Sequence, residues 1–237
     1  MYFWLIPLII GILLLGVFLY FRVKEKRVIA VIFKGCVSLM FIATALVAWL
    51  TSKNPNNTFG IFALLGLAFG LIGDILLDIK YIDLKKELMW TILGFFAFAF
   101  GHVFYATGLF IHFYDFNANV LYLVIPIVVT VLLVIVTLLM EKFTPIKYGK
   151  MKPFVVIYGL FLFFDTSIYF STTIMTGWQV VPLVMFTIGL ILFMLSDLIL
   201  NNTYFATGYN KGVYIITNHV LYYIAQFTIA VSLFFLI

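Results

Sequence analysis

Two aspartates lie inside apolar segments long enough to cross a membrane. Asp74 lies in GLIGDILL at 70–77, and Asp197 lies in FMLSDLIL at 193–200. A carboxylate in hydrocarbon costs at least about 2.5–3.5 kcal/mol, so such a group usually faces protein or water at a functional site. Two carboxyl groups in one apolar site have pKa values that separate, because the second ionisation is opposed by burial and by the first charge. The pair could therefore supply a general acid and a carboxylate base, or else hold helices together as polar packing residues.

Three further ionisable side chains are expected near these aspartates in depth. By the helical rise of 1.5 Å per residue, Asp74 and Asp197 would lie about 5 Å below one membrane boundary. Lys34 and His219 would enter from the same side to about 10 Å, and His102 would lie at about 18 Å. Lys34 could extend to the lipid headgroups or bind a phosphate. Each histidine could be a packing residue or part of the site.

Other polar residues in the spans have a less direct connection to chemistry. Asp78, one turn after Asp74, is expected at the level of the lipid headgroups, where a solvated role fits. Asp165 lies deep in a span and has no counterpart in the other half of the chain, and His112 is expected at an outer helix end. The single cysteine, Cys36, excludes an internal disulfide and fits apolar packing.

The composition predicts the elements that must position these residues. The chain has 237 residues, of which 65% are hydrophobic and 10% charged, and its mean hydropathy is +1.22. Soluble domains carry about 45–50% apolar and about 25% charged residues, so a water-soluble fold is excluded. Helices are the expected spanning element, because lipid offers unpaired backbone groups no partner. We predict one all-α membrane domain, 1–237, with eight transmembrane helices near 2–21, 28–50, 58–77, 90–111, 118–139, 152–174, 179–200 and 212–236.

The basic residues predict the orientation of this bundle. The segments after predicted helices one, three, five and seven, counted with the first residue of the next span, hold four, three, four and one Lys or Arg, which is twelve of the fourteen. Lys53 lies on the opposite side and Lys34 lies within a span. The positive-inside rule then makes the basic side cytoplasmic, with both termini non-cytoplasmic and the aspartates in the cytoplasmic half of the membrane. No clustered basic and aromatic surface predicts a nucleic-acid partner.

Three short similarities suggest that the chain is duplicated. They occur in the same order in both halves, at offsets of 123, 117 and 118 residues. The pairs are GLIGDILL at 70–77 with FMLSDLIL at 193–200, HVFY at 102–105 with HVLY at 219–222, and KGCV at 34–37 with KPFV at 152–155. Since four helices separate equivalent motifs, the halves, about 1–115 and 116–237, would be two parallel four-helix repeats. Similar apolar composition without duplication is the alternative.

Four motifs together resemble the YhhN family of lysoplasmalogenase-like membrane proteins. They are G-D-x-x-L ending the third span, G-H-x-x-Y in the fourth, L-S-D in the seventh and Y-x-A-Q in the eighth. In this sequence the matching residues are Gly73, Asp74, Leu77, Gly101, His102, Tyr105, Ser196, Asp197, Tyr223, Ala225 and Gln226. The resemblance spans nearly the whole chain and includes the eight-helix count. It implies hydrolysis of the vinyl ether bond of lysoplasmalogens to a fatty aldehyde and a glycerophospho-base, with the shared carboxylates at Asp74 and Asp197. The resemblance implies no role for Asp78 or Asp165, which match no family position.

Vinyl ether hydrolysis suits two carboxyl groups. The ether breaks when an acid protonates its outer alkenyl carbon, giving an oxocarbenium ion that water attacks; the hemiacetal then collapses. One neutral acid and one carboxylate are needed, which we predict to be Asp74 and Asp197 without an order between them, and Lys34 could hold the phosphodiester. The predicted binding or supporting residues are Lys34, His102, Tyr105, His219, Tyr223 and Gln226. We expect no metal and no other cofactor, a lysophospholipid substrate, membrane lipids as the other partners, and a bacterial inner membrane as the location.

Two other classes of protein stay open. A metal-dependent lipid hydrolase of the ceramidase kind would need histidine ligands, but the chain has three histidines and no H-x-x-x-H pair. A transporter or lipid-binding protein would also explain charges inside a duplicated bundle. The spans lack an obvious pair of Gly/Pro-broken helices, although Pro126 and Pro182 lie within them. Stoichiometric zinc would favour the first class, and coupled uptake into liposomes the second.

Overall fold

A computed structural model describes residues 2–55, 57–208 and 211–237, and this part of the chain forms eight long α-helices. All eight are long and apolar enough to cross a membrane, which confirms the predicted count and makes the chain an integral multi-pass membrane protein. The helices are α1 (Leu5–Val23), α2 (Arg27–Leu50), α3 (Thr58–Ile79), α4 (Glu87–His112), α5 (Leu121–Phe143), α6 (Lys152–Met175), α7 (Val181–Phe205) and α8 (Gly212–Ser232).

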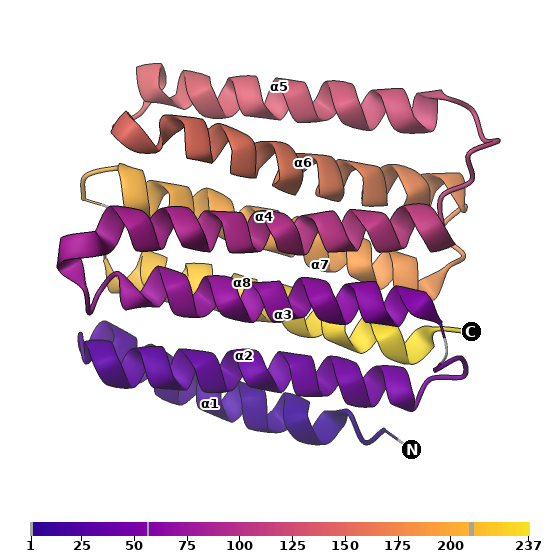
Figure 1. Cartoon of the computed structure of the whole chain (residues 1–237), viewed down its shortest axis with the longest axis horizontal. Coiled ribbons are helices and arrows are strands. Elements are labelled where there is room, and N and C mark those ends of the chain that lie inside the picture. Colours follow the sequence, from indigo (N-terminus) through magenta and orange to yellow (C-terminus); the bar gives the residue numbers. More distant parts are fainter. Residues whose placement is uncertain (1, 56, 209–210) are drawn as a thin grey trace.

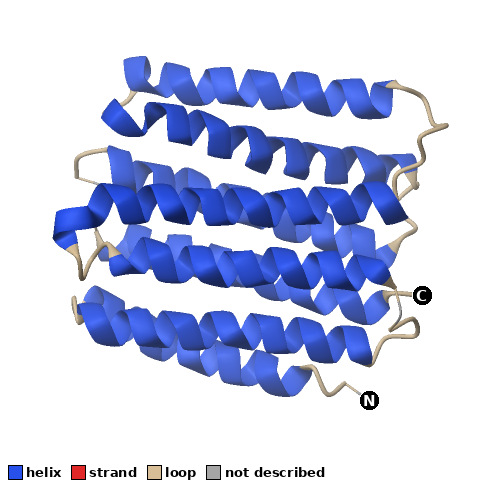
Figure 2. Cartoon of the chain, in the orientation of Figure 1, coloured by secondary structure: helices blue, strands red, loops and turns tan. Residues whose placement is uncertain are grey.

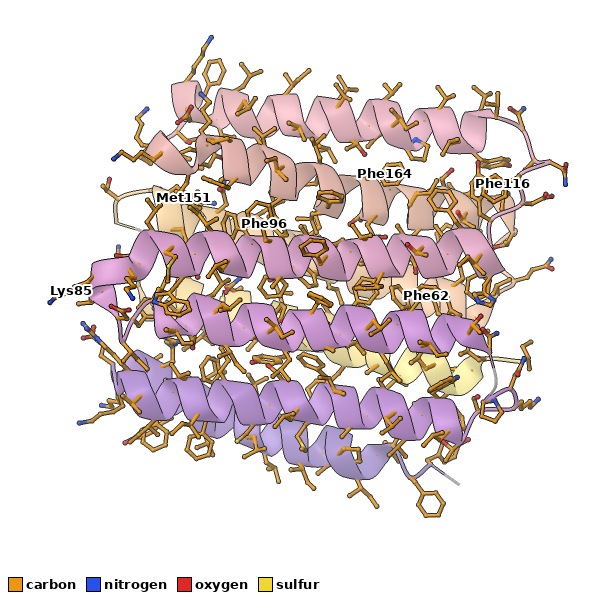
Figure 3. All side chains as sticks on the ribbon, in the orientation of Figure 1. Phe62, Lys85, Phe96, Phe116, Met151 and Phe164 are labelled. Atoms are coloured by element: carbon orange, nitrogen blue, oxygen red, sulfur yellow. The ribbon has the colours of Figure 1, made fainter. Side chains whose placement is uncertain are left out.

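The helices run side by side along one axis, with consecutive helices antiparallel (Figure 1). Helices α2, α3 and α4 form one layer, α1, α8 and α7 lie behind it, and α5 lies at the edge, mainly against α6. The turns fall at the two ends of the bundle (Figure 2). Both termini lie at one end, and the turns after α1, α3, α5 and α7 lie at the other, which we call the basic end because it carries twelve of the fourteen Lys and Arg. Lys85 marks this end in Figure 3.

Close packing of α3 against α4 depends on two glycines of α3. A Cβ at Gly66 would lie 2.1 Å from the ring of Tyr105, and one at Gly73 would lie 2.6 Å from the ring of Phe98. Small residues let membrane helices approach closely, where packing must replace the hydrophobic effect. The aromatic rings of α4 therefore lie directly on the α3 backbone, and this contact fixes the rotation of α3 and the direction in which Asp74 points.

Several helix ends differ by a few residues from the predicted spans, and three of them bear on the site. Helix α1 includes Arg22, α3 continues to Ile79, and α7 continues to Phe205 instead of ending near residue 200. In the polar stretch at the end of α7, Asn202 and Thr203 donate side-chain hydrogen bonds to carbonyls of the preceding turn. The predicted ends stop before the first polar residue, whereas these three helices continue past it. The duplicated halves and the side that each end faces stay predictions.

Candidate active site

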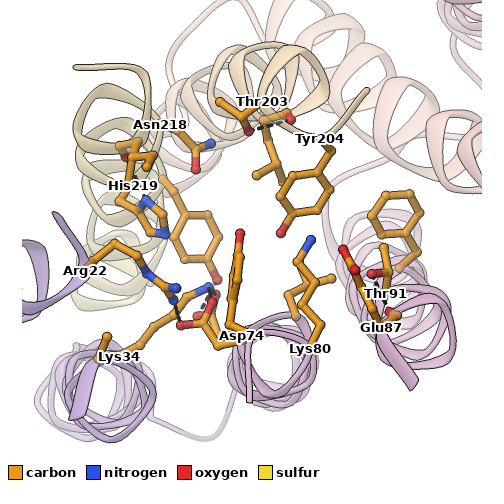
Figure 4. A pocket seen from close by; sticks show the side chains of 18 of the residues that line it. Arg22, Lys34, Asp74, Lys80, Glu87, Thr91, Thr203, Tyr204, Asn218 and His219 are labelled. Atoms are coloured by element: carbon orange, nitrogen blue, oxygen red, sulfur yellow. Dashed lines mark hydrogen bonds and ion pairs between the residues drawn. The ribbon is translucent and has the colours of Figure 1, made fainter. Parts of the chain in front are cut away.

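A cavity of about 840 Å³ lies at the basic end of the bundle, and part of its lining is shown in Figure 4. Every helix except α5 contributes side chains to its lining. Its volume is within the range of about 300–1,000 Å³ that small-molecule sites usually occupy. Exposed Lys26, Arg27 and Lys85 lie at its rim, and buried carboxyl and ammonium groups lie inside. The cavity is therefore a polar pocket set into an apolar bundle.

Asp74 is the most fully partnered carboxyl group in the cavity, and it is 1% exposed. Its Oδ1 lies 3.2 Å from the ammonium of Lys34. Its Oδ2 accepts hydrogen bonds from the hydroxyls of Ser38, at 2.6 Å, and Tyr222, at 2.8 Å. The Tyr223 hydroxyl lies 3.2 Å from that of Ser38 and donates to the backbone carbonyl of Lys34 at 3.3 Å. Helices α2, α3 and α8 thus meet around this one carboxyl group.

Asp78 forms a second buried ionic contact one turn further along α3. It accepts from the guanidinium of Arg22, and its Oδ1 lies 3.2 Å from the Lys34 ammonium. The expected solvated role of Asp78 is wrong, because this side chain is 2% exposed and lies between two cations. The expectation that Lys34 extends to the lipid headgroups is wrong as well. Its ammonium points inward to Asp74 and Asp78, and the residue is 5% exposed.

Asp197 lines the same cavity from α7. Its Oδ2 accepts a hydrogen bond from the hydroxyl of Tyr158 on α6. Unlike Asp74, it has no cation within ion-pair distance among the described residues. The structure therefore places both predicted catalytic aspartates in the lining of one cavity, one in an ionic network and the other beside a tyrosine hydroxyl.

The predicted supporting residues divide by depth. Lys34 and His219 line the cavity, and the Nδ1 of His219 lies 2.7 Å from the carbonyl oxygen of Ile215 in its own helix. Tyr223 lies behind Asp74, as described above. Gln226 is fully buried deeper in α8, where the missing side chain of Gly70 leaves room for its amide. These last two residues shape the wall behind the site but do not line the cavity.

His102 and Tyr105 lie outside the cavity in the core of the bundle. The Nδ1 of His102 lies 2.9 Å from Oδ2 of Asp165, and both residues are almost completely buried. Asp165, which the sequence ranked below the other aspartates as a candidate site residue, is thus the partner of His102, a predicted site residue. The carbonyl of Tyr105 accepts a hydrogen bond of 2.9 Å from Tyr169. His112 lies at the opposite end of the bundle, 2.5 Å from the hydroxyl of Thr58.

Sequence reasoning missed five residues that line the cavity or donate to its carboxyl groups. Tyr222 ends the repeated H-V-x-Y motif, and Ser38 follows Lys34 by one turn, so both could have been found from spacing. Arg22 and Lys80 were counted only as topology charges at span ends, and Tyr158 was one aromatic among many. Arg22 turns inward because Asp78 accepts from it and the rings of Tyr81 and Phe18 lie 4.6 Å and 5.5 Å from its guanidinium. The missed residues are Arg22, Ser38, Lys80, Tyr158 and Tyr222.

The chemistry of the cavity is that of carboxyl, ammonium and hydroxyl groups. Within the described ranges, no three His, Cys, Asp or Glu side chains come together as the ligands of one metal ion would. The arrangement offers proton donors and acceptors in one cavity, with cations beside them. Such a set can move protons and bind an anion.

Comparison with known proteins gives one finding. No curated protein and no solved structure matches the chain. The model of the YhhN family matches residues 29–233, which covers α3 to α8 entirely and nearly all of α2. This range includes both predicted catalytic aspartates, Asp74 and Asp197, and the four motifs that resemble the family. The chain belongs to the YhhN family.

Proposed function

We propose that the protein is a membrane-embedded hydrolase that cleaves the vinyl ether bond of lysoplasmalogens to a fatty aldehyde and a glycerophospho-base. The observation that carries the proposal is the shared cavity of Asp74 and Asp197, which come from opposite halves of the chain. Membership of the YhhN family is consistent with it. Vinyl ether hydrolysis needs one carboxylic acid and one carboxylate, and these two residues supply both groups in an apolar bundle.

Their surroundings suggest which residue plays which role. Asp74 can be held as a carboxylate because the Lys34 ammonium and two hydroxyl donors surround it. Asp197 has one hydroxyl donor, from Tyr158, and no neighbouring cation, so it can carry the proton that the reaction needs. Asp197 is therefore the general acid in this proposal, and Asp74 is the base and the stabiliser of the oxocarbenium ion.

The reaction restores both groups in two stages. Asp197 gives its proton to the outer alkenyl carbon, and the carbon bonded to oxygen becomes an oxocarbenium carbon beside the Asp74 carboxylate. Water attacks that carbon and gives one proton to Asp74, forming the hemiacetal. Asp74 then protonates the glycerol oxygen as the C–O bond breaks, while Asp197 takes the hemiacetal proton. The net change is addition of one water, and positioned acid–base groups of this kind contribute about 10²–10⁴-fold each.

The depth of the carboxyl groups fits a bond next to a glycerol backbone. Asp74 lies five residues before the end of α3 and Asp197 eight before the end of α7. By helical rise these positions are about 7 Å and about 12 Å inside the ends of their helices. A lysophospholipid could place its headgroup near the basic end and its vinyl ether at this depth, with its alkyl tail further along the bundle.

Aldehyde release from matched lipids tests the proposal. The protein, purified in detergent, is given a lysoplasmalogen and a saturated alkyl ether lipid with the same headgroup and chain length. We expect aldehyde from the alkenyl lipid and no product from the alkyl lipid, because an alkyl ether has no double bond to protonate. Cleavage of another lipid ester or ether without aldehyde release would keep the site but discard the substrate. Coupled uptake of a solute into liposomes, with no cleavage, would favour a transporter.

A further inference from the structure

Lys80 is a buried cation of the cavity, and in the described part of the chain no carboxylate lies within ion-pair distance of it. It is the first residue after α3, it lines the cavity and it is 5% exposed. Its ammonium lies 3.2 Å from the ring centroid of Tyr204 and 5.1 Å from that of Tyr81. In Figure 4 it points into the cavity towards Tyr204, with Glu87 at its side. Among the described residues, none forms an ion pair with it.

The other buried charges of the cavity are already matched. The cations Arg22 and Lys34 are paired with the carboxylates of Asp74 and Asp78. An aromatic ring attracts an ammonium but does not cancel its charge, so Lys80 leaves the buried wall with one unpaired positive charge. A buried charge without a partner is unfavourable. An anionic group of a ligand would remove this cost.

We propose that Lys80 binds the phosphate of the lipid substrate and makes the site select phosphate-bearing lysolipids over neutral alkenylglycerols. This inference deepens the proposed function and rests on it. Lys34, which the sequence suggested for the phosphate, is occupied by Asp74 and Asp78. Lys80 follows Asp74 by six residues, which puts it about 9 Å closer to the basic end by helical rise. A lysophospholipid has its phosphate on this side when its ether bond reaches the carboxyl groups.

The ionisation of Lys80, which lies just beyond the end of α3, supports this role. Burial lowers the pKa of Lys80 to about 7; the charge of Glu87 raises the pKa, and those of Lys34 and Arg22 lower it further. Below pH 7 the ammonium is present, and it is lost as the pH rises through that value. A bound phosphate would raise the pKa of Lys80, so phosphate-bearing ligands should bind more weakly at alkaline pH.

Binding of lipids that the enzyme cannot cleave tests Lys80 separately from catalysis. Calorimetric titration in detergent compares 1-O-alkyl-glycerophosphocholine, which has chain and phosphate, with 1-O-alkylglycerol, which lacks the phosphate. Glycerophosphocholine, which lacks the chain, is the third ligand. The variants are Lys80→Gln and a matched control, Lys86→Gln, which removes the same charge from an exposed residue of the same turn that does not line the cavity.

We expect Lys80→Gln to weaken binding of the alkyl phospholipid about tenfold to a hundredfold, the usual effect of a hydrogen bond to a charged group. Binding of alkylglycerol and all binding by Lys86→Gln should match the wild type. The proposal would be overturned if Lys80→Gln bound the alkyl phospholipid as tightly as the wild type does. It would also be overturned if the variant lost the same factor of affinity for the alkyl phospholipid and for alkylglycerol. Tight binding of glycerophosphocholine by the wild type would support the phosphate contact, but it would overturn the proposal that the phosphate belongs to a lipid, because this ligand has no alkyl chain. Because no cleavage is measured, these results stand even if lysoplasmalogen is not a substrate.

Discussion

Replacing Lys34 by methionine removes the ammonium that two carboxylates share. Methionine is an unbranched side chain that fills irregular space in protein cores, so the change acts mainly on charge. Asp74 loses its cation, and Asp78 keeps only Arg22.

The expected loss of stability is large. Removing one partner of a buried ion pair costs about 3–5 kcal/mol, because the other charge is left uncompensated. For a chain of 150–250 residues each kcal/mol shifts the melting temperature by about 2–4 °C, so Lys34→Met should melt roughly 6–20 °C lower. The double variant Lys34→Met/Asp74→Asn removes one cation and one carboxylate and leaves the pair of Arg22 with Asp78 intact. It should recover most of this loss, since replacing both members of a buried pair is often near neutral.

Thermal unfolding in detergent, followed at one heating rate, measures these effects. Lys53→Met is the control, because Lys53 is exposed at the opposite end of the bundle and should change stability by no more than about 0.5 kcal/mol. A Lys34→Met variant as stable as the wild type would refute the ionic network. So would a double variant whose loss equals the sum of the two single losses, because contacting charges must be coupled.

Three more predictions concern the pH dependence of binding, the α3–α4 contact and Asp197. Since burial lowers the pKa of Lys80 to about 7, the affinity of the wild type for alkyl phospholipid should fall between about pH 6 and about pH 9. The affinity of Lys80→Arg should not change over this range, because arginine remains charged. Calorimetry at several pH values distinguishes the two results. Gly73→Val should lose about 1–3 kcal/mol of stability by overpacking against α4, while Gly35→Val, whose Cβ position meets nothing within 4 Å, should not; equal melting temperatures would count against the close contact. Tyr158→Phe removes the hydroxyl that Asp197 accepts from and should slow aldehyde release about tenfold; an unchanged rate would remove Tyr158 from the mechanism.

The helices and the two aspartates could be predicted because each depends on a property that is read along the chain. Hydropathy over about 20 residues predicts a span whatever its neighbours are, and the described residues form eight such helices. A carboxyl group in hydrocarbon is unfavourable anywhere in a span, so Asp74 and Asp197 stand out without knowledge of packing. Depth follows from helical rise only once the helix ends are known: because α7 continues to Phe205, Asp197 lies deeper than the expected depth of about 5 Å.

The remaining residues of the site depend on helix rotation, which no linear pattern gives. Asp78 was expected at the headgroup level, yet Arg22 and Lys34 enclose it. The direction in which α3 turns its aspartates follows from contacts such as that of Gly73 with Phe98. Lys80 has the same sequence context as other basic residues at span ends, and only the rings beside it show that it points inward.

The initial rate of aldehyde release from lysoplasmalogen by Asp→Asn variants tests the carboxylate pair most directly. Asparagine keeps the shape of the side chain but is neither a general acid nor a carboxylate base. We predict that Asp74→Asn and Asp197→Asn each lose at least about a hundredfold of the rate. Asp115→Asn, in an exposed loop at the opposite end of the bundle, should keep it. A full rate in either of the first two variants would contradict the proposed mechanism.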